Sequence, residues 1–254
     1  MNKYDLLKSK FDNKEKIVGA CMAMFNNTFI LNRMAMRDDL DFIVFDAEHG
    51  VFDAQNIINA LQVNRLLGVP SVVRVQDAEY YLVAKLVDMG ADGIMIPRTE
   101  TLEQLRIAVD GLLFQPDGRK GMGGIAQMRP GEKYDDFKKT RFLLPQIESP
   151  EGIKNLPNML EEFGEYISAV IIGPYDMSVA VGTPCNIASD EMMNAIQEVF
   201  DVCKKYNKSC GIFCDDENLA KKYRKMGANV LWMATDRDYF LRGYNAMLDG
   251  VKDL

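Results

Sequence analysis

The stretch from Asp41 to Gly50, DFIVFDAEHG, guides the interpretation of the whole chain. Its first half, DFIVF, has the apolar composition of a strand that is buried on both faces. The stretch then ends in Asp46, Glu48 and His49, the only histidine of the protein. Charged side chains at the carboxyl end of a buried strand are typical of catalytic residues in α/β barrels. A structural strand followed by a polar turn explains the stretch equally well, so the remaining sequence has to decide.

Seven further apolar runs resemble this strand, and amphipathic helical patterns lie between them. Eight strands that alternate with helices predict a single (β/α)8 TIM barrel over residues 1–254. A doubly wound open sheet is the alternative. Such a sheet usually has a glycine-rich turn after its first strand, and residues 22–29 contain no glycine. The predicted strands are 17–25, 41–46, 71–75, 92–97, 142–148, 169–174, 209–214 and 229–234.

The composition excludes several classes of partner. The net charge of −7 argues against binding to nucleic acid. No apolar run reaches the ~18 residues that a membrane span needs, and the polar N-terminus lacks the apolar segment of a secretion signal. The five cysteines include no CxxC pair, which indicates neither a disulfide framework nor a zinc site. We therefore expect a cytoplasmic protein that binds neither membranes nor nucleic acid.

Polar side chains follow several of the predicted strands, where a barrel carries its chemistry. Arg74 lies within the apolar run SVVRV and needs an anionic partner if it is buried. Gln146 and Glu148 share one face of the fifth strand, and Asp176 follows the sixth. The carboxylates of Glu148 and Asp176 could converge on a hard cation such as Mg²⁺ or Mn²⁺. A structural salt bridge for Arg74 and separate helix-cap roles for the two carboxylates are the alternatives.

Other kinds of chemistry find no support in the sequence. A single histidine rules out a site with several histidine ligands, and no GxSxG motif marks a nucleophilic serine. No lysine lies inside a predicted strand, so we expect no Schiff-base lysine and no pyridoxal phosphate. We expect no nucleotide cofactor.

One connection is too long for a compact barrel. A loop of about residues 114–140, rich in glycine and basic side chains, separates the fourth helix from the fifth strand. Loops of this length are usually functional or disordered. We predict a flap or a loop that contacts an anion, with a solvated excursion as the alternative.

Five motifs taken together resemble the HpcH/HpaI family of class II, metal-dependent pyruvate aldolases. They are DFIVFDAEHG, VVRV, LVDMGADGIMIP, LPQIES and IIGPYDMSVAVG, and the resemblance covers about residues 17–245. It implies a (β/α)8 barrel that cleaves a 4-hydroxy-2-oxo or 2-keto-3-deoxy acid into pyruvate and an aldehyde. A CoA-ester lyase of the citrate or malyl type and a non-catalytic barrel that binds an oxo-acid are the alternatives.

The resemblance also implies roles for residues that match the family's motifs. Glu148 and Asp176 match the ligands of a divalent cation, Mg²⁺, Mn²⁺ or Co²⁺. Arg74 matches the arginine that contacts the keto oxygen of the substrate. His49 matches the histidine that serves in acid–base chemistry, and Asp46 matches its carboxylate partner.

Further matches concern the substrate and the assembly. Gln146 matches a glutamine near the pyruvate, and the backbone amides of Tyr175 and Asp176 match donors to the pyruvate carboxylate. Asp88 matches an aspartate that approaches the site of a neighbouring subunit. The family fold exchanges its last helix between subunits, so the resemblance implies a homo-oligomer, either a trimer or a hexamer.

The chain departs from the family's pattern at two places. The family loop YPPxGxRGxG corresponds to FQPDGRKGMG at 114–123, where Lys120 takes the arginine position and Arg119 precedes it. Arg98 stands where relatives carry a small or apolar residue. We hypothesise that Arg98 narrows the pocket or contacts an acidic aldehyde. We expect Trp232, the only tryptophan, to be a core residue.

Overall fold

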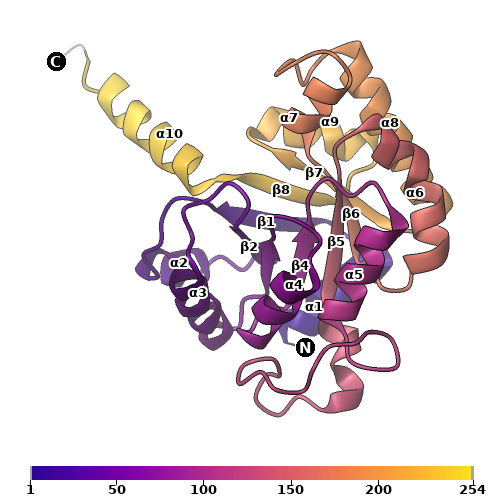
Figure 1. Ribbon diagram of the computed structural model, residues 1–254. Helices are drawn as coiled ribbons and strands as arrows, with labels where there is room; N and C mark the ends of the chain where they lie inside the picture. Colours follow the sequence, from indigo (N-terminus) through magenta and orange to yellow (C-terminus); the bar gives the residue numbers. More distant parts are fainter. Residues whose placement is uncertain (1, 253–254) are drawn as a thin grey trace.

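A computed structural model describes residues 2–252, and it contains the predicted barrel (Figure 1). Eight parallel strands pair in chain order, and β8 pairs with β1 to close the sheet. The prediction of a TIM barrel is therefore confirmed, and the open sheet is excluded. The strands are β1 (Ile17–Met22), β2 (Phe42–Asp46), β3 (Ser71–Arg74), β4 (Gly93–Ile96), β5 (Phe142–Ile147), β6 (Ala169–Ile172), β7 (Ser209–Cys214) and β8 (Val230–Thr235).

Helices surround this sheet, and α1 lies at the end where the strands begin (Figure 1). Two short 3-10 helices, η1 (Tyr134–Asp136) and η2 (Lys138–Thr140), lie in the long loop before β5. The α-helices are α1 (Lys3–Asn13), α2 (Phe29–Met34), α3 (Ala54–Leu67), α4 (Tyr80–Asp88), α5 (Leu102–Leu112), α6 (Pro150–Phe163), α7 (Pro174–Ala180), α8 (Asp190–Lys205), α9 (Glu217–Met226) and α10 (Asp236–Asp249). No helix among residues 2–252 is both long and apolar enough to cross a membrane.

The alternation of side chains along β2 explains how the fold creates a site. Phe42 and Val44 belong to the cluster inside the barrel, whereas Ile43 and Phe45 pack in the layer between strands and helices. Successive side chains on a strand point to opposite faces. Asp46 therefore continues the inward face of Phe42 and Val44, at the point where the strand ends.

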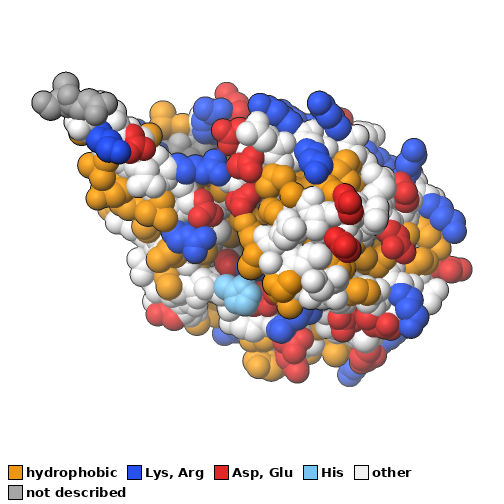
Figure 2. All heavy atoms as spheres, turned by 90° about the horizontal axis from the view of Figure 1, so that it is seen from above, with side chains coloured by type: hydrophobic (Ala, Val, Ile, Leu, Met, Phe, Trp, Pro, Cys, Tyr) orange, Lys and Arg blue, Asp and Glu red, His pale blue; other side chains and the backbone are white. Residues whose placement is uncertain are grey.

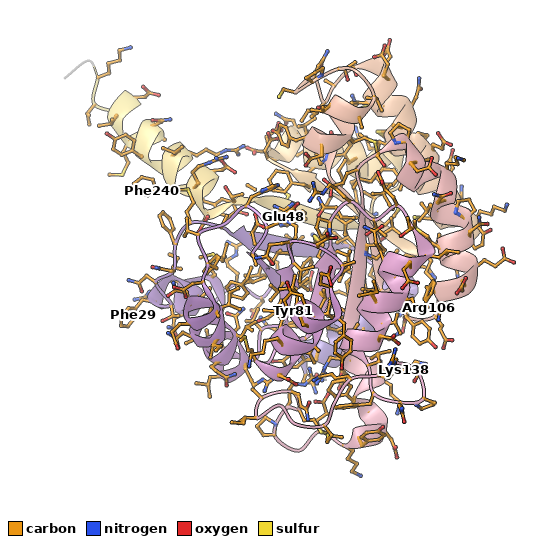
Figure 3. All side chains as sticks on the ribbon, in the orientation of Figure 1. Phe29, Glu48, Tyr81, Arg106, Lys138 and Phe240 are labelled. Atoms are coloured by element: carbon orange, nitrogen blue, oxygen red, sulfur yellow. The ribbon has the colours of Figure 1, made fainter. Side chains whose placement is uncertain are left out.

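The long loop at 113–141 lies at the opposite end of the barrel. It follows α5 and precedes β5, so it connects the end of a helix to the start of a strand. Arg129 in the loop pairs with Asp92, just before β4, at 2.7 Å, and Arg141 pairs with Glu132 at 2.9 Å. Lys138 marks this lower end in Figure 3 and Glu48 the upper end. The loop therefore cannot act as a flap over this chain's own strand ends, and an anion contact of the loop stays a prediction.

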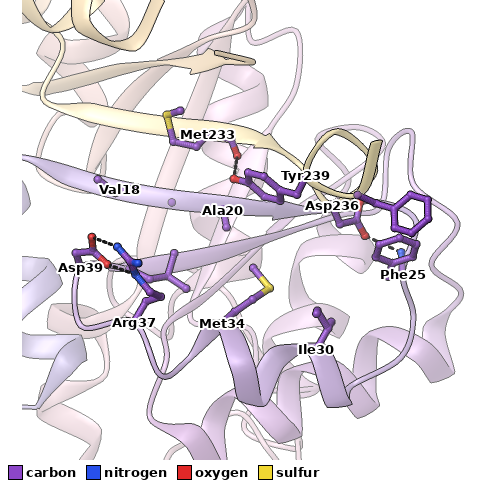
Figure 4. A pocket seen from close by; sticks show the side chains of 13 residues that line it. Val18, Ala20, Phe25, Ile30, Met34, Arg37, Asp39, Met233, Asp236 and Tyr239 are labelled. Atoms are coloured by element: carbon purple, nitrogen blue, oxygen red, sulfur yellow. Dashed lines mark hydrogen bonds and ion pairs between the residues drawn. The ribbon is translucent and has the colours of Figure 1, made fainter. Parts of the chain in front are cut away.

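The last helix, α10, extends away from the barrel instead of packing on it (Figure 1). Asp236 is its only buried residue. Its apolar side chains remain exposed, including Phe240 at 56%, Tyr244 at 51% and Met247 at 78%. The outer faces of β1 and β8 are consequently left without a covering helix of their own. A groove of about 660 Å³ lies there, lined by residues such as Val18, Ala20, Ile30, Met34 and Met233 (Figure 4).

Candidate active site

The ends of β2 and β3 carry a buried ion pair. Asp46 and Arg74 are register partners in the sheet, and both face the barrel interior. Arg74 donates through Nε to Oδ1 of Asp46 at 2.9 Å and through Nη2 to Oδ2 at 2.6 Å. Burial alone would lower the pKa of Arg74, but the hydrogen bonds and charge of Asp46 outweigh it and raise that pKa. The salt bridge expected as an alternative for Arg74 is therefore present.

Glu48 belongs to the same cluster, although the sequence assigned it no chemistry and only a role in orienting His49 or the loop. Its side chain is 9% exposed, and Oε2 lies 3.2 Å from Nη1 of Arg74 without hydrogen-bond geometry. Oε1 lies 3.8 Å from Nη2 of Arg98. Burial raises the pKa of Glu48, and the neighbouring Arg74 limits the rise. The DAEH motif was the available signal, because the turn after β2 brings Glu48 back over Arg74.

His49 lies at the mouth of the site. Its side chain is 64% exposed, and as the only histidine it is the pale blue residue on the face in Figure 2. Nε2 lies 3.7 Å from Oε1 of Glu48. Only the backbone N–H of His49 reaches Asp46, at 3.2 Å. The carboxylate that approaches the imidazole is thus Glu48, not Asp46 as the resemblance implied, because Asp46 is committed to Arg74.

A pair of carboxyl groups, Glu148 and Asp176, lies just after the ends of β5 and β6. Burial raises the pKa of Glu148 to about 8, and a hydrogen bond with the Asp176 side chain adds to the rise. The backbone N–H of Arg98 donates to Oε1 of Glu148 at 2.9 Å. A Cβ at Gly173 would collide with the Glu148 carboxylate, so glycine is required there for the close approach. The two carboxylates meet as the sequence suggested, and Ser149, not Glu148, caps α6.

This acidic pair fits a divalent cation. Two adjacent carboxyl groups provide the hard oxygen ligands that Mg²⁺ and Mn²⁺ prefer. Within the described residues, no group of three or more His, Cys, Asp or Glu side chains converges on one point. A cation held by Glu148 and Asp176 would therefore take its remaining ligands from substrate and water.

The Asp46–Arg74 ion pair and Asp176 line one cavity of about 390 Å³. Its polar wall includes the predicted residues Asp46, His49, Arg74, Gln146, Tyr175 and Asp176. Apolar side chains, among them Met24, Val51, Phe213 and Trp232, form the rest of the lining. The hydroxyl of Tyr175 donates to Asp215. The cavity thus combines charged and polar side chains with apolar ones.

Three predicted residues, Asp88, Arg98 and Glu148, do not line this cavity. Glu148 is buried and touches Asp176, which does line it. Asp88 ends α4 at the far end of the barrel, where it pairs with Lys120 of the long loop. Its implied role toward a neighbouring subunit stays a prediction. Arg98 follows β4 with a positive φ of 43°, and its side chain is 66% exposed beside Glu48.

Arg237 also lines the cavity, although the sequence did not single it out. It follows the end of β8, directly after Asp236. Nε and Nη2 of Arg237 both approach one oxygen of Asp238, at 3.2 and 3.0 Å, which leaves Nη1 without a protein partner in the described residues. Its position two residues after a strand end was the available signal.

Comparison with known proteins agrees with this geometry. A model of the HpcH/HpaI aldolase/citrate lyase family matches residues 23–242. The chain belongs to this family. It is 28% identical to 4-hydroxy-2-oxo-heptane-1,7-dioate aldolase of Klebsiella pneumoniae over 212 residues, which are 82% of this chain and 79% of the relative. It is 26% identical to 2-keto-3-deoxy-L-rhamnonate aldolase of Salmonella gallinarum over 90% of this chain and 87% of the relative.

Solved structures share the fold. The crystal structure of an HpcH/HpaI aldolase from Desulfitobacterium hafniense has a TM-score of 0.89 with 24% identity, and it covers 98% of this chain and 97% of its own. A citrate synthase, SbnG, superposes with a TM-score of 0.84 at 20% identity, covering 97% of each chain. At these identities the likeness shows the barrel alone.

Proposed function

We propose that the chain is a divalent-metal-dependent pyruvate aldolase. It would cleave a 4-hydroxy-2-oxo or 2-keto-3-deoxy acid into pyruvate and an aldehyde, and catalyse the reverse addition. The observation that carries this proposal is that Arg74 and Asp176 line one cavity, with the Glu148 carboxyl group hydrogen-bonded to Asp176. The aldolases among the relatives support the same reaction class.

Arg74 would stabilise the enolate that forms when the carbon–carbon bond breaks. An arginine has five N–H donors, and Asp46 engages one on Nε and one on Nη2. The remaining donors face Glu48 and the cavity. A fixed cation with free N–H groups beside a keto oxygen stabilises the negative charge that develops there.

Glu148 and Asp176 would hold the cation, and Mg²⁺, Mn²⁺ and Co²⁺ are the candidates. When bound, such a cation supplies Lewis-acid polarisation of the C2 carbonyl. Gln146 lines the same wall and can donate to the oxo-acid. The backbone amides of Tyr175 and Asp176, in the first turn of α7, are proposed to bind the substrate carboxylate.

His49 would handle the proton at the other half of the cavity. In cleavage, a base takes the proton of the C4 hydroxyl, the C3–C4 bond breaks, and its electron pair forms the pyruvate enolate. Protonation of C3 then gives pyruvate. An exposed imidazole can exchange this proton through water, and Glu48 lies close enough to orient it. The CoA-ester lyase and the non-catalytic barrel gain no specific support from the cavity.

We further propose a homo-oligomer, a trimer or hexamer, in which α10 of one copy fills the groove on β1 and β8 of another. The groove lies where an eighth helix would cover the barrel, and α10 carries the exposed apolar face that would fit it (Figure 4). The cytosol remains the compartment that we propose, because all five cysteines are free.

Metal dependence is the first test. Purified enzyme should release pyruvate from 4-hydroxy-2-oxo acids, followed by coupling to lactate dehydrogenase. EDTA should abolish the release because the acidic pair alone cannot polarise the carbonyl, and Mg²⁺, Mn²⁺ or Co²⁺ should restore it. Cleavage that persists in EDTA would overturn the metal assignment, and no release from any hydroxy-oxo acid would overturn the activity.

The two arginines at the rim allow a matched test of aldehyde recognition. Addition of pyruvate to succinic semialdehyde and to uncharged butanal should be compared in Arg237→Met and Arg98→Met. If Arg237 binds the aldehyde's carboxylate, its variant should lose about 10-fold or more in kcat/KM for the charged aldehyde only, because a charge-assisted hydrogen bond is removed. The same selective loss in the Arg98 variant would favour the hypothesis made from the sequence. If neither variant differed from the native enzyme with either aldehyde, neither Arg237 nor Arg98 would bind the aldehyde's carboxylate.

The proposed helix exchange predicts the oligomeric state. Sedimentation velocity should give a trimer or hexamer for the native protein. Phe240→Asp and Tyr244→Asp should dissociate it, because each places a charge in the apolar contact. Leu66→Asp, which changes a residue that is 87% exposed on α3, is the matched control and should leave the assembly intact. A monomeric native protein would contradict the proposal.

A further inference from the structure

Trp232 is buried in the wall of the candidate active site. It lies on β8, follows Val230 on the inward face of the barrel, and is only 2% exposed. The same side chain lines the cavity that Asp46 and Arg74 face. The prediction that Trp232 is buried is therefore confirmed. In addition, its ring contacts Arg74 in the cavity wall.

Three contacts define how the indole is held. Its ring lies under the guanidinium of Arg74, with 5.1 Å between Cζ and the ring centroid. Phe213 packs against it edge-to-face at 5.0 Å between centroids. Its N–H lies beside the buried thiol of Cys21, and within residues 2–252 Nε1 has no hydrogen bond of acceptable geometry. The ring is thus locked by packing, with its face toward Arg74.

The carboxylates around Arg74 hold only the edge of its guanidinium. Asp46 binds Nε and Nη2, and Glu48 lies near Nη1. Contacts in the plane of the group do little to prevent it from tilting toward the open cavity. A ring packed on one face removes that freedom, and a cation over an indole is attracted to it as well. Asp46, Glu48 and Trp232 together therefore fix both the edge and the plane.

We propose that Trp232 is a positioning residue that sets the plane of the Arg74 guanidinium, so that its free N–H groups aim at the keto oxygen of the bound oxo-acid. This inference rests on the proposed function, because it assigns Trp232 to the group that would stabilise the enolate. It extends that function, since neither the motifs nor the acidic pair required an aromatic side chain at this place.

Positioning makes a different prediction from packing alone. A residue that only fills the core changes stability when it is altered, and kcat stays near its native value. A residue that aims a donor at a developing charge changes kcat more than KM, because the interaction forms mainly in the transition state. The conservative replacement by another aromatic ring should retain most of the effect.

The test compares Trp232→Leu, Trp232→Phe and Phe142→Leu in the full-length, Mg²⁺-loaded enzyme. Phe142 belongs to the same interior cluster and is fully buried, but it lies at the start of β5, away from Arg74. Trp232→Leu should lower kcat for pyruvate release about 10-fold, with KM changed much less. Trp232→Phe should stay within about 3-fold of the native enzyme. Phe142→Leu should lower the melting temperature and leave kcat unchanged.

A spectroscopic measurement does not depend on turnover. Because Trp232 is the only tryptophan, its emission reports on this wall alone. Titration with oxalate, a non-reacting mimic of the pyruvate enolate, should change the emission in a saturable way when Mg²⁺ is present. Without Mg²⁺, and in Arg74→Met with Mg²⁺, the change should be lost or strongly reduced.

The outcomes separate the two proposals. If the native enzyme releases pyruvate but Trp232→Leu keeps its kcat, or Phe142→Leu loses as much, the positioning role is overturned and the proposed function stands. If the native enzyme cleaves no hydroxy-oxo acid, the proposed function fails, and the oxalate titration decides the inference. An Arg74-dependent change in emission would then support the coupling of the two side chains, and an unchanged emission would overturn it.

Discussion

The buried pair between Asp46 and Arg74 is the interaction on which the site depends. It joins the ends of two neighbouring strands inside the barrel, where neither charge could remain alone. Removing one partner of such a pair typically costs about 3–5 kcal/mol, because the other charge stays buried and uncompensated. The salt bridge with Asp46 therefore holds the guanidinium of Arg74 in the wall of the cavity. That arrangement reconciles the two interpretations of Arg74, since the same side chain is a structural partner of Asp46 and a donor toward the cavity.

Strand direction imposes the second constraint. Parallel strands bring all their carboxyl ends to one end of the barrel, so Arg74 and Asp176 line one cavity although they are far apart in the sequence. The same rule sends every loop that precedes a strand to the other end. Asp88 and Lys120 pair there, away from this chain's own cavity. If Asp88 or Lys120 acts in catalysis, it would therefore act in the site of another copy. The proposed helix exchange would bring such a copy close.

Much of this was predictable from the sequence, because burial on both faces gives parallel strands a continuous apolar pattern and the barrel follows from their number. The meeting of Glu148 with Asp176 followed from neighbouring strands. The partner of Asp46 did not, because it depends on the register between β2 and β3, which residue types do not reveal. The sequence predicted only that Trp232 is a core residue, and its contact with Arg74 became visible in the structure. The long loop follows a helix and precedes a strand, and this order already placed it at the end of the barrel where strands begin. Its glycines and basic residues suggested a flap instead.

We propose that a pyruvate enolate forms in this cavity and that Arg74 stabilises its negative charge. Exchange of the methyl hydrogens of pyruvate for deuterium in D₂O, followed by proton NMR, tests this step without any aldehyde. With Mg²⁺ the native enzyme should catalyse the exchange, and Arg74→Met should slow it by about 10²-fold or more while Mg²⁺ binding persists. No exchange by the native enzyme, or an unchanged rate in the variant, would contradict the account.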